Sequence, residues 1–425
     1  MPFVSVVNLG CRVNRVESDR ISADLARNGF CLVEPDAADL VVINTCAVTG
    51  EAEAKTRKAV RHALAMPRSP RVVVTGCVVN LHPEELTEIS ERVTAEPSKV
   101  AVADRVREIL GHAGYESSSA CGELDERDIA SMLGRSRLGV KIQDGCNHRC
   151  TYCIVWKARG PERSVPVESV LKQVREAVAA GIPEVVLTGV NLGAYDAEDG
   201  SDSHVEIDEL VERILEQTYI QQVRISSIEP MDVSDALIDC MAAHPDRVAP
   251  FVHLPVQSGC TDTLHRMGRP YTAEAFCEQV EHLREKIPNI AISGDLIVGF
   301  PGETEEEFET TLAMVERGAF ARLHVFRYSA RPGTPAATFD NQVAPEIMAQ
   351  RSAKVRSLVE RTCLKDAAHR IGSLESAVLE YGNRGTLGSF HRIIVDDADS
   401  KSEGSLVRVR IDSLDDANML HGHLA

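Results

Sequence analysis

The sequence predicts an α/β protein with an N-terminal doubly wound α/β domain, a central partial (β/α)6 barrel and a small C-terminal β-barrel. Three observations carry this prediction. Strand and helix patterns alternate through residues 1–115, six more strand candidates with helical patterns between them follow in residues 137–365, and residues 370–425 change to a β pattern. With 425 residues and 44% apolar composition, the chain can bury several cores.

The first region has the pattern of a parallel sheet with crossover helices. Its strand candidates are VSVVNLG, LVVINTC, RVVVTGC and KVAVAD, and its helical patterns are ESDRISADLARNGF, EAEAKTRKAVRHALAM and PEELTEISERV. Cys11, Cys46 and Cys77 stand at the ends of the first three strands, where open α/β sheets bind ligands. One such cysteine would be an ordinary packing residue. Three at the same edge favour a ligand set.

A linker is expected at residues 116–136, which are rich in serine and charge, although its middle has some helical character. The barrel strands expected after it are LGVKIQ, EVVLTGVN, VRISSIE, FVHLPVQ, ISGDLIVGF and RLHVFRYS. Polar residues and glycines gather at their ends, for example in TGVN, SSIEP, VQSG and RYSARPGT. Because parallel barrels carry their chemistry at the C-terminal strand ends, we expect a pocket at this rim.

Cys146, Cys150 and Cys153 form a C-x3-C-x2-C pattern after the first barrel strand. A structural zinc site needs a fourth Cys or His, and the spacing of His148 fits no common zinc pattern. Three thiolates instead suit a 4Fe–4S cluster with one iron left open. The other six cysteines are expected to pack or to be exposed, with Cys260 at the barrel mouth the least certain of them: Cys31, Cys121, Cys240, Cys260, Cys277 and Cys363.

The segment CNHRCTYC resembles the radical S-adenosylmethionine (SAM) superfamily. The resemblance implies that SAM binds the open iron and is cleaved to a 5′-deoxyadenosyl radical, which can break a strong C–H bond. GDLIVGFPGE resembles the family's strand-five region beside the SAM adenine, and TGVN its site near the SAM amino group. The resemblance makes five residues candidate SAM or substrate contacts: Tyr152, Asn191, Ser227, Gln257 and Asp295.

Together with the N-terminal triplet, this arrangement resembles the radical SAM methylthiotransferases. The motifs on which this resemblance rests are GCRVNRVES, NTCAVT with AEAKTR, TGC and KIQDGC. The resemblance implies a second 4Fe–4S cluster on Cys11, Cys46 and Cys77 that holds the sulfur to be inserted. It also implies two SAM molecules per product, a reductant and a sulfur source. The alternative from another class is a non-catalytic iron–sulfur redox or carrier protein.

Cys11-Arg-Val-Asn14 followed by Glu17-Ser18 is closest to the branch that modifies carbon 2 of N6-threonylcarbamoyladenosine beside the tRNA anticodon. Branches acting on isopentenyladenosine in tRNA or on a ribosomal protein aspartate are the alternatives. One departure is Val155-Trp156-Lys157, where such branches usually have Ile-Pro before an aromatic residue. The only tryptophan, Trp156, either stacks on a base or packs the barrel mouth, and the roles of Trp156 and Lys157 stay open.

The tRNA anticodon stem-loop is the expected partner, and residues 370–425 resemble the TRAM domain, a small barrel that grips RNA. This region has six Lys or Arg against nine Asp or Glu, and the whole chain has a net charge of −18, so RNA must meet a local basic patch. The candidates are the run from Lys55 to Arg71 and four arginines of the barrel: Arg384, Arg392, Arg408 and Arg410. Solvated surface charge explains them equally well.

The sequence has no run that resembles a transmembrane span, and its first residues lack the basic start and apolar core of a signal peptide. We therefore expect a cytoplasmic protein that does not act at a membrane.

Overall fold

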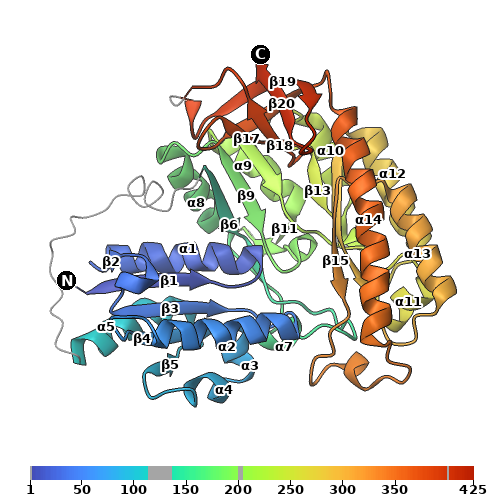
Figure 1. Ribbon diagram of the computed structural model, residues 1–425. Coiled ribbons are helices and arrows are strands. Elements are labelled where there is room, and N and C mark those ends of the chain that lie inside the picture. Colours follow the sequence, from blue (N-terminus) through green and yellow to red (C-terminus); the bar gives the residue numbers. More distant parts are fainter. Residues whose placement is uncertain (1, 113–135, 200–203, 400–401) are drawn as a thin grey trace.

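The computed structural model describes residues 2–112, 136–199, 204–399 and 402–425 and has the three predicted parts (Figure 1). The expected linker at 116–136 lies outside the described residues except for its last position. Within the described residues, no helix is both long and apolar enough to span a membrane.

The N-terminal domain is a five-stranded parallel sheet in the order β2-β1-β3-β4-β5, with helices on both faces. Its strands are β1 Phe3–Asn8, β2 Cys31–Leu32, β3 Leu40–Thr45, β4 Arg71–Gly76 and β5 Val93–Ala95. Its helices are α1 Arg12–Arg27, α2 Gly50–Leu64, α3 Cys77–Leu81, α4 Glu84–Thr87 and α5 Val102–His112.

Alternation along the buried strands builds two cores. In β3, Val41 and Ile43 pack on the α2 side, whereas Leu40 and Val42 pack on the side of α1 and α5. The prediction of a strand at KVAVAD was wrong. Val102, Val106 and Leu110 are buried at helical spacing, so the segment begins α5, and the last strand is the shorter β5.

This strand order has its topological switch point between β1 and β3, where connections leave to opposite sides of the sheet. Leu9, Gly10 and Cys11 follow β1, and Cys46 follows β3. Two of the three N-terminal cysteines therefore stand at the crevice where this class of sheet binds ligands.

The central domain contains all six predicted strands as two parallel sheets, β6-β9-β12 and β13-β14-β15. A bridge between Ser227 and His253 joins β12 to β13 and completes a partial barrel. The strands are β6 Arg137–Lys141, β9 Glu184–Thr188, β12 Gln222–Ile225, β13 Phe251–His253, β14 Ala291–Val298 and β15 Arg322–Arg327. The helices are α7 Val155–Arg159, α8 Val167–Ala179, α9 Ile207–Gln217, α10 Asp235–Ala243, α11 Thr261–Arg266, α12 Ala273–Lys286, α13 Glu305–Gly318 and α14 Pro345–His369. Two short hairpins pair β7 Gln143–Asp144 with β8 Arg163–Ser164 and β10 Ala197–Glu198 with β11 His204–Val205.

The C-terminal region closes into a five-stranded barrel in the order β16-β17-β18-β20-β19, which lies on one end of the central domain (Figure 1). Its strands are β16 Leu374–Leu379, β17 Arg384–Leu387, β18 Arg392–Val395, β19 Leu406–Leu414 and β20 Leu420–Leu424. The sequence patterns indicated β16, β18 and β19. Arg224 on β12 anchors this barrel, because its fully buried guanidinium pairs with Glu184 at 2.7 Å and donates to the carbonyls of Leu387 and Gly388.

A second buried arginine joins the first two domains. Arg159, the last residue of α7, donates to Glu17 on α1 at 2.8 Å and to the side-chain oxygen of Asn14 at 2.7 Å. Lys141 and Lys99 also contact Glu17. Burial opposes ionisation of Glu17, but the hydrogen bond from Arg159 and the three cations outweigh it and hold the pKa of this carboxyl well below its usual range.

We expect Glu17→Gln to lower the free energy of unfolding by about 3 kcal/mol, because it leaves buried cations without their counter-charge. The depressed pKa of Glu17 makes its contribution complete above the unfolded-state pKa of about 4 and lost as pH falls below it. Urea denaturation should therefore show a gap between wild type and variant at pH 7 that narrows below about pH 4. Glu168→Gln, which breaks an exposed pair with Arg175, is the control and should change the midpoint little. An equal effect of both variants would contradict the prediction.

Candidate functional site

The three N-terminal cysteines lie at the ends of neighbouring strands, as predicted. Cys11 immediately precedes α1, Cys46 follows β3, and Cys77 is the first residue of α3. Gly10 has a positive φ of 98° and lies against Cys46, so a Cβ at this position would collide with the cysteine side chain. The loop after β1 can approach Cys46 closely only with glycine there.

Electrostatics also link these thiols. Burial, with smaller contributions from the charges of Cys11 and Cys77, raises the pKa of Cys46 to about 11. Burial likewise raises the pKa of Cys77, with Cys11 adding to the effect. The three cysteines follow β1, β3 and β4, which are neighbours in the sheet. Two buried thiols and the exposed Cys11 at one sheet edge are a donor set that suits a soft metal centre such as an iron–sulfur cluster.

The second triplet lines a cavity of about 280 Å³ at the C-terminal rim of the barrel. Burial raises the pKa of Cys146 to about 11 and that of Cys153 to about 12, and in each case the charge of Cys150 contributes. His148 lines the same cavity, but among the described residues no fourth cysteine does. The donor set is three thiols facing open space, which fits a cluster that keeps one position for another ligand.

Four of the five predicted SAM or substrate contacts line this cavity: Tyr152, Ser227, Gln257 and Asp295. Gln257 has a positive φ of 65°, a strained conformation for a non-glycine residue that is typical of ligand sites. The fifth, Asn191, is not in the cavity wall. Its buried side chain lies 3.4 Å from the Nε2 of His148, and its Oδ1 has no hydrogen-bond partner. Asn191 thus supports a residue of the wall.

Sequence reasoning missed three charged residues of the wall, Glu229, Arg269 and Arg327. Arg269 has a side chain only 1% exposed, forms an ion pair with Glu229, and donates to the Sγ of Cys150 at 3.2 Å. Arg269 follows α11, 119 positions from Cys150, and no local pattern marks it. Glu229 belongs to the SSIEP motif, but only its serine had been singled out.

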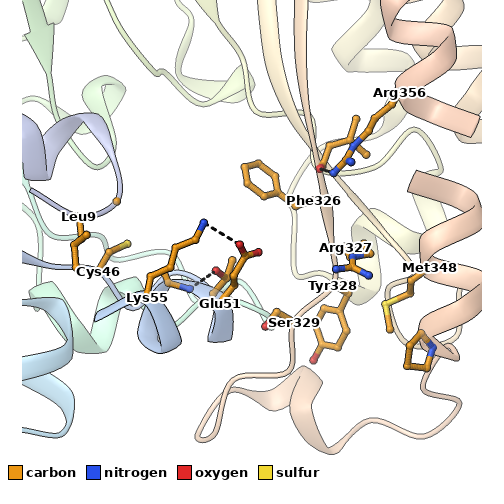
Figure 2. Close-up of a pocket in the computed structure, with 15 residues that line it drawn as sticks. Leu9, Cys46, Glu51, Lys55, Phe326, Arg327, Tyr328, Ser329, Met348 and Arg356 are labelled. Carbon is orange, nitrogen blue, oxygen red and sulfur yellow. Dashed lines mark hydrogen bonds and ion pairs between the residues drawn. The ribbon is translucent and has the colours of Figure 1, made fainter. Parts of the chain in front are cut away.

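A larger cavity of about 730 Å³ lies between the N-terminal domain and the wall formed by β15 and α14 (Figure 2). Leu9, Gly10 and Cys46 line it on one side and Met348 on the other. Its wall shares five residues with the smaller cavity: Thr49, Phe326, Arg327, Tyr328 and Ser329. Cys46 of the first triplet and the three cysteines of the second triplet therefore line adjoining cavities.

Trp156 also lines the smaller cavity, between two cations. The guanidinium carbon of Arg149 lies 4.1 Å from the ring centroid and the Nζ of Lys157 lies 5.1 Å from it. Lys157 in turn donates to the carbonyl of Gly333 at 2.6 Å. Val155 and Trp156 of the unusual segment thus line the cavity, whereas Lys157 contacts the Trp156 ring from outside the lining.

The basic candidates are partly neutralised. In the run from Lys55 to Arg71, ion pairs join Lys55 to Glu51, Arg57 to Glu85 and Arg68 to Asp39. On the C-terminal barrel, Arg392 pairs with Glu380 and Arg408 with Asp246, Arg410 donates to the carbonyl of Gly372, and Arg384 is exposed. Cys260 lies within 4.8 Å of Asp262 and Glu307, but Glu307 is paired with Arg266 at 2.6 Å.

The fold and the cysteine-lined cavity are those of a radical SAM enzyme. The Radical SAM superfamily model matches residues 140–315, and the model described as Uncharacterized protein family UPF0004 matches residues 4–95. The radical SAM methyltransferase TsrM from Kitasatospora setae shares the fold, with a TM-score of 0.55 at 16% identity over 79% of this chain and 75% of that one. The cobalamin-dependent radical SAM enzyme OxsB gives 0.51 at 14% identity over 85% and 56%.

Similar curated proteins identify the family within the radical SAM enzymes. Threonylcarbamoyladenosine tRNA methylthiotransferases MtaB of Thermotoga maritima and Bacillus subtilis are 33% and 35% identical, over 93% and 89% of this chain and 91% and 84% of theirs. A tRNA-2-methylthio-N(6)-dimethylallyladenosine synthase of Novosphingobium aromaticivorans is 33% identical over 88% of this chain and 86% of its own. The chain belongs to the radical SAM methylthiotransferase family, as the cysteine motifs predicted. It is an enzyme, so the alternative of a non-catalytic carrier was wrong, and the family uses SAM and a 4Fe–4S cluster.

The contact of Arg269 with Cys150 predicts an electrochemical effect. Because a hydrogen bond to a ligating sulfur stabilises the reduced cluster, Arg269→Met should lower the reduction potential of the cluster at this triplet. A redox titration followed by electron paramagnetic resonance measures it. The control is Arg266→Met, since Arg266 pairs with Glu307 outside the cavity. A potential unchanged in Arg269→Met, or equally changed in both, would refute the prediction.

Proposed function

We propose that this enzyme adds a methylthio group to carbon 2 of N6-threonylcarbamoyladenosine next to the anticodon of tRNA. The observation that carries the proposal is that Cys46 of the first triplet and all three cysteines of the second triplet line adjoining cavities with a shared wall. Insertion of a methylthio group at an unactivated carbon requires hydrogen removal and a sulfur source, and neither site alone supplies both. The larger cavity, about 730 Å³, has the size of a nucleotide site.

In this proposal Cys146, Cys150 and Cys153 hold the 4Fe–4S cluster that reductively cleaves SAM. Cys11, Cys46 and Cys77 would hold a second cluster, which would supply the sulfur. Two SAM molecules are used per product, and a reductant and a sulfur source act from outside the chain. Four other residues of the smaller cavity bind and orient SAM and the nucleotide: Tyr152, Ser227, Gln257 and Asp295. Asn191 supports His148 in the same wall.

Two findings support the choice of substrate. The motifs around Cys11, Cys46 and Cys146 resemble those of the threonylcarbamoyladenosine branch. Three relatives of that name cover 89% or more of this chain, and the third is from Chlamydia pneumoniae, at 33% identity over 98% of this chain. Isopentenyladenosine in tRNA is the second candidate, because relatives named for the dimethylallyl nucleoside reach 33% identity.

Nucleoside mass spectrometry of tRNA tests the substrate. Cells that lack the gene should lose the methylthio form of threonylcarbamoyladenosine and accumulate the unmodified form. The wild-type gene should restore the product, whereas genes carrying Cys150→Ala or Cys77→Ala should not. Persistence of the methylthio product in the deletion strain would rule out the assignment, and selective loss of the methylthio isopentenyl nucleoside would establish the second candidate.

Iron content tests the two sites separately. Protein reconstituted without oxygen should bind about eight irons per chain, and Cys150→Ala and Cys77→Ala should each retain about four. Only Cys77→Ala should still cleave SAM, because its SAM site is intact. If wild type binds only about four irons and Cys77→Ala loses none, the N-terminal triplet does not hold a cluster.

A further inference from the structure

The larger cavity has a surplus of positive charge in a chain whose net charge is −18. Its charged wall residues are Lys55, Arg327 and Arg356 against one acid, Glu51 (Figure 2). Lys55 and Glu51 neutralise each other through an ion pair at 2.8 Å. Arg356 reaches the carbonyl of Val325 at 3.5 Å, and no carboxylate of the described residues forms an ion pair with it or with Arg327. The wall of the larger cavity therefore carries unpaired positive charge, which favours the binding of an anion.

Arg327 has a special position among these cations. It is the last residue of β15, where its backbone pairs with Val298 of β14, and it is exposed. It lines both the cavity that contains Cys46 and the cavity that contains the second triplet. The neighbouring Phe326, 41% exposed, also lines both. An anionic group bound by Arg327 would hold its molecule at the junction of the two spaces.

We propose that Arg327 is the specificity-determining residue that binds the carboxylate of the threonylcarbamoyl side chain. The inference rests on the proposed function and deepens it. A threonylcarbamoyl group ends in a carboxylate at neutral pH, whereas an isopentenyl group carries no charge. A guanidinium binds a carboxylate through two parallel charge-assisted hydrogen bonds, and an apolar group in its place leaves the cation without a partner.

The test compares three synthetic anticodon stem-loop RNAs that differ only at the nucleotide beside the anticodon. One carries threonylcarbamoyladenosine, one its methyl ester, and one plain adenosine. Reconstituted full-length wild-type protein should bind the acid at least about tenfold more tightly than the ester. Arg327→Gln should bind acid and ester equally, and Arg327→Lys should recover part of the preference. Arg175→Gln, which removes an exposed arginine outside both cavities, should keep the wild-type preference.

The ratio of acid to ester binding is measured within each variant, so a general loss of folded protein does not change it. A preference that survives in Arg327→Gln would overturn the proposal. Equal weakening of all three RNAs with the preference intact would assign Arg327 to the phosphate backbone instead. A failure of the proposed function would be seen in a different experiment. In that case the deletion strain would keep its methylthio threonylcarbamoyladenosine, whatever the binding ratios of the Arg327 variants are.

Discussion

The relative position of the two cysteine triplets depends on one buried ion pair, between Glu17 and Arg159. Both side chains are 4% exposed, and charges so deeply buried must stay paired. Glu17 lies on α1, which starts directly after Cys11, and Arg159 ends α7, which starts shortly after Cys153. Around this pair, Ile154 and Ala158 pack into the core of the N-terminal domain, and Asn80 of α3 donates to the carbonyl of Ala158 at 2.8 Å. The cysteine loop of the barrel is thus packed against the helix that begins with Cys77.

Similar buried arginines fix the other walls of the cavities. Arg331, in the loop after β15, pairs with Glu53 of α2 and ties the two sides of the larger cavity together. Arg351 of α14 pairs with Glu303 at 2.6 Å and also donates to its carbonyl, so the helix that carries Met348 and Arg356 is held to the end of β14. Each arginine satisfies a carboxylate or carbonyl from a different element, which a lysine with a point charge would do less specifically.

Sequence patterns were sufficient for features that depend on local order. The six cysteines follow strands that are recognisable from β-branched runs, and the parallel topology then brings the strand ends together. The position of Arg269 could not be predicted, because its contact with Cys150 arises only when the loop after α11 folds over the rim. KVAVAD failed because the alternating Val100 and Val102 suit a strand, whereas Val102 also begins a helical spacing with Val106, and burial of Val102 and Val106 against the sheet selects the helix. The strands β17 (RGTL) and β20 (LHGHL) contain no run of β-branched residues, so their pairing within the closed barrel defines them.

The surroundings of charged residues could likewise not be predicted from the local sequence pattern. The run from Lys55 to Arg71 looks basic in sequence, yet Lys55, Arg57 and Arg68 are each paired with an acid from another turn or element. Arg327 belongs to no basic run, and it lines both cavities. A whole-chain charge of −18 disfavours unspecific attraction to the RNA backbone, so phosphate contacts depend on local cations that stay unpaired. Recognition of the modified nucleotide in the proposed reaction depends in the same way on charge that the fold places, and in the cavity beside Cys46 that charge comes from Arg327 and Arg356.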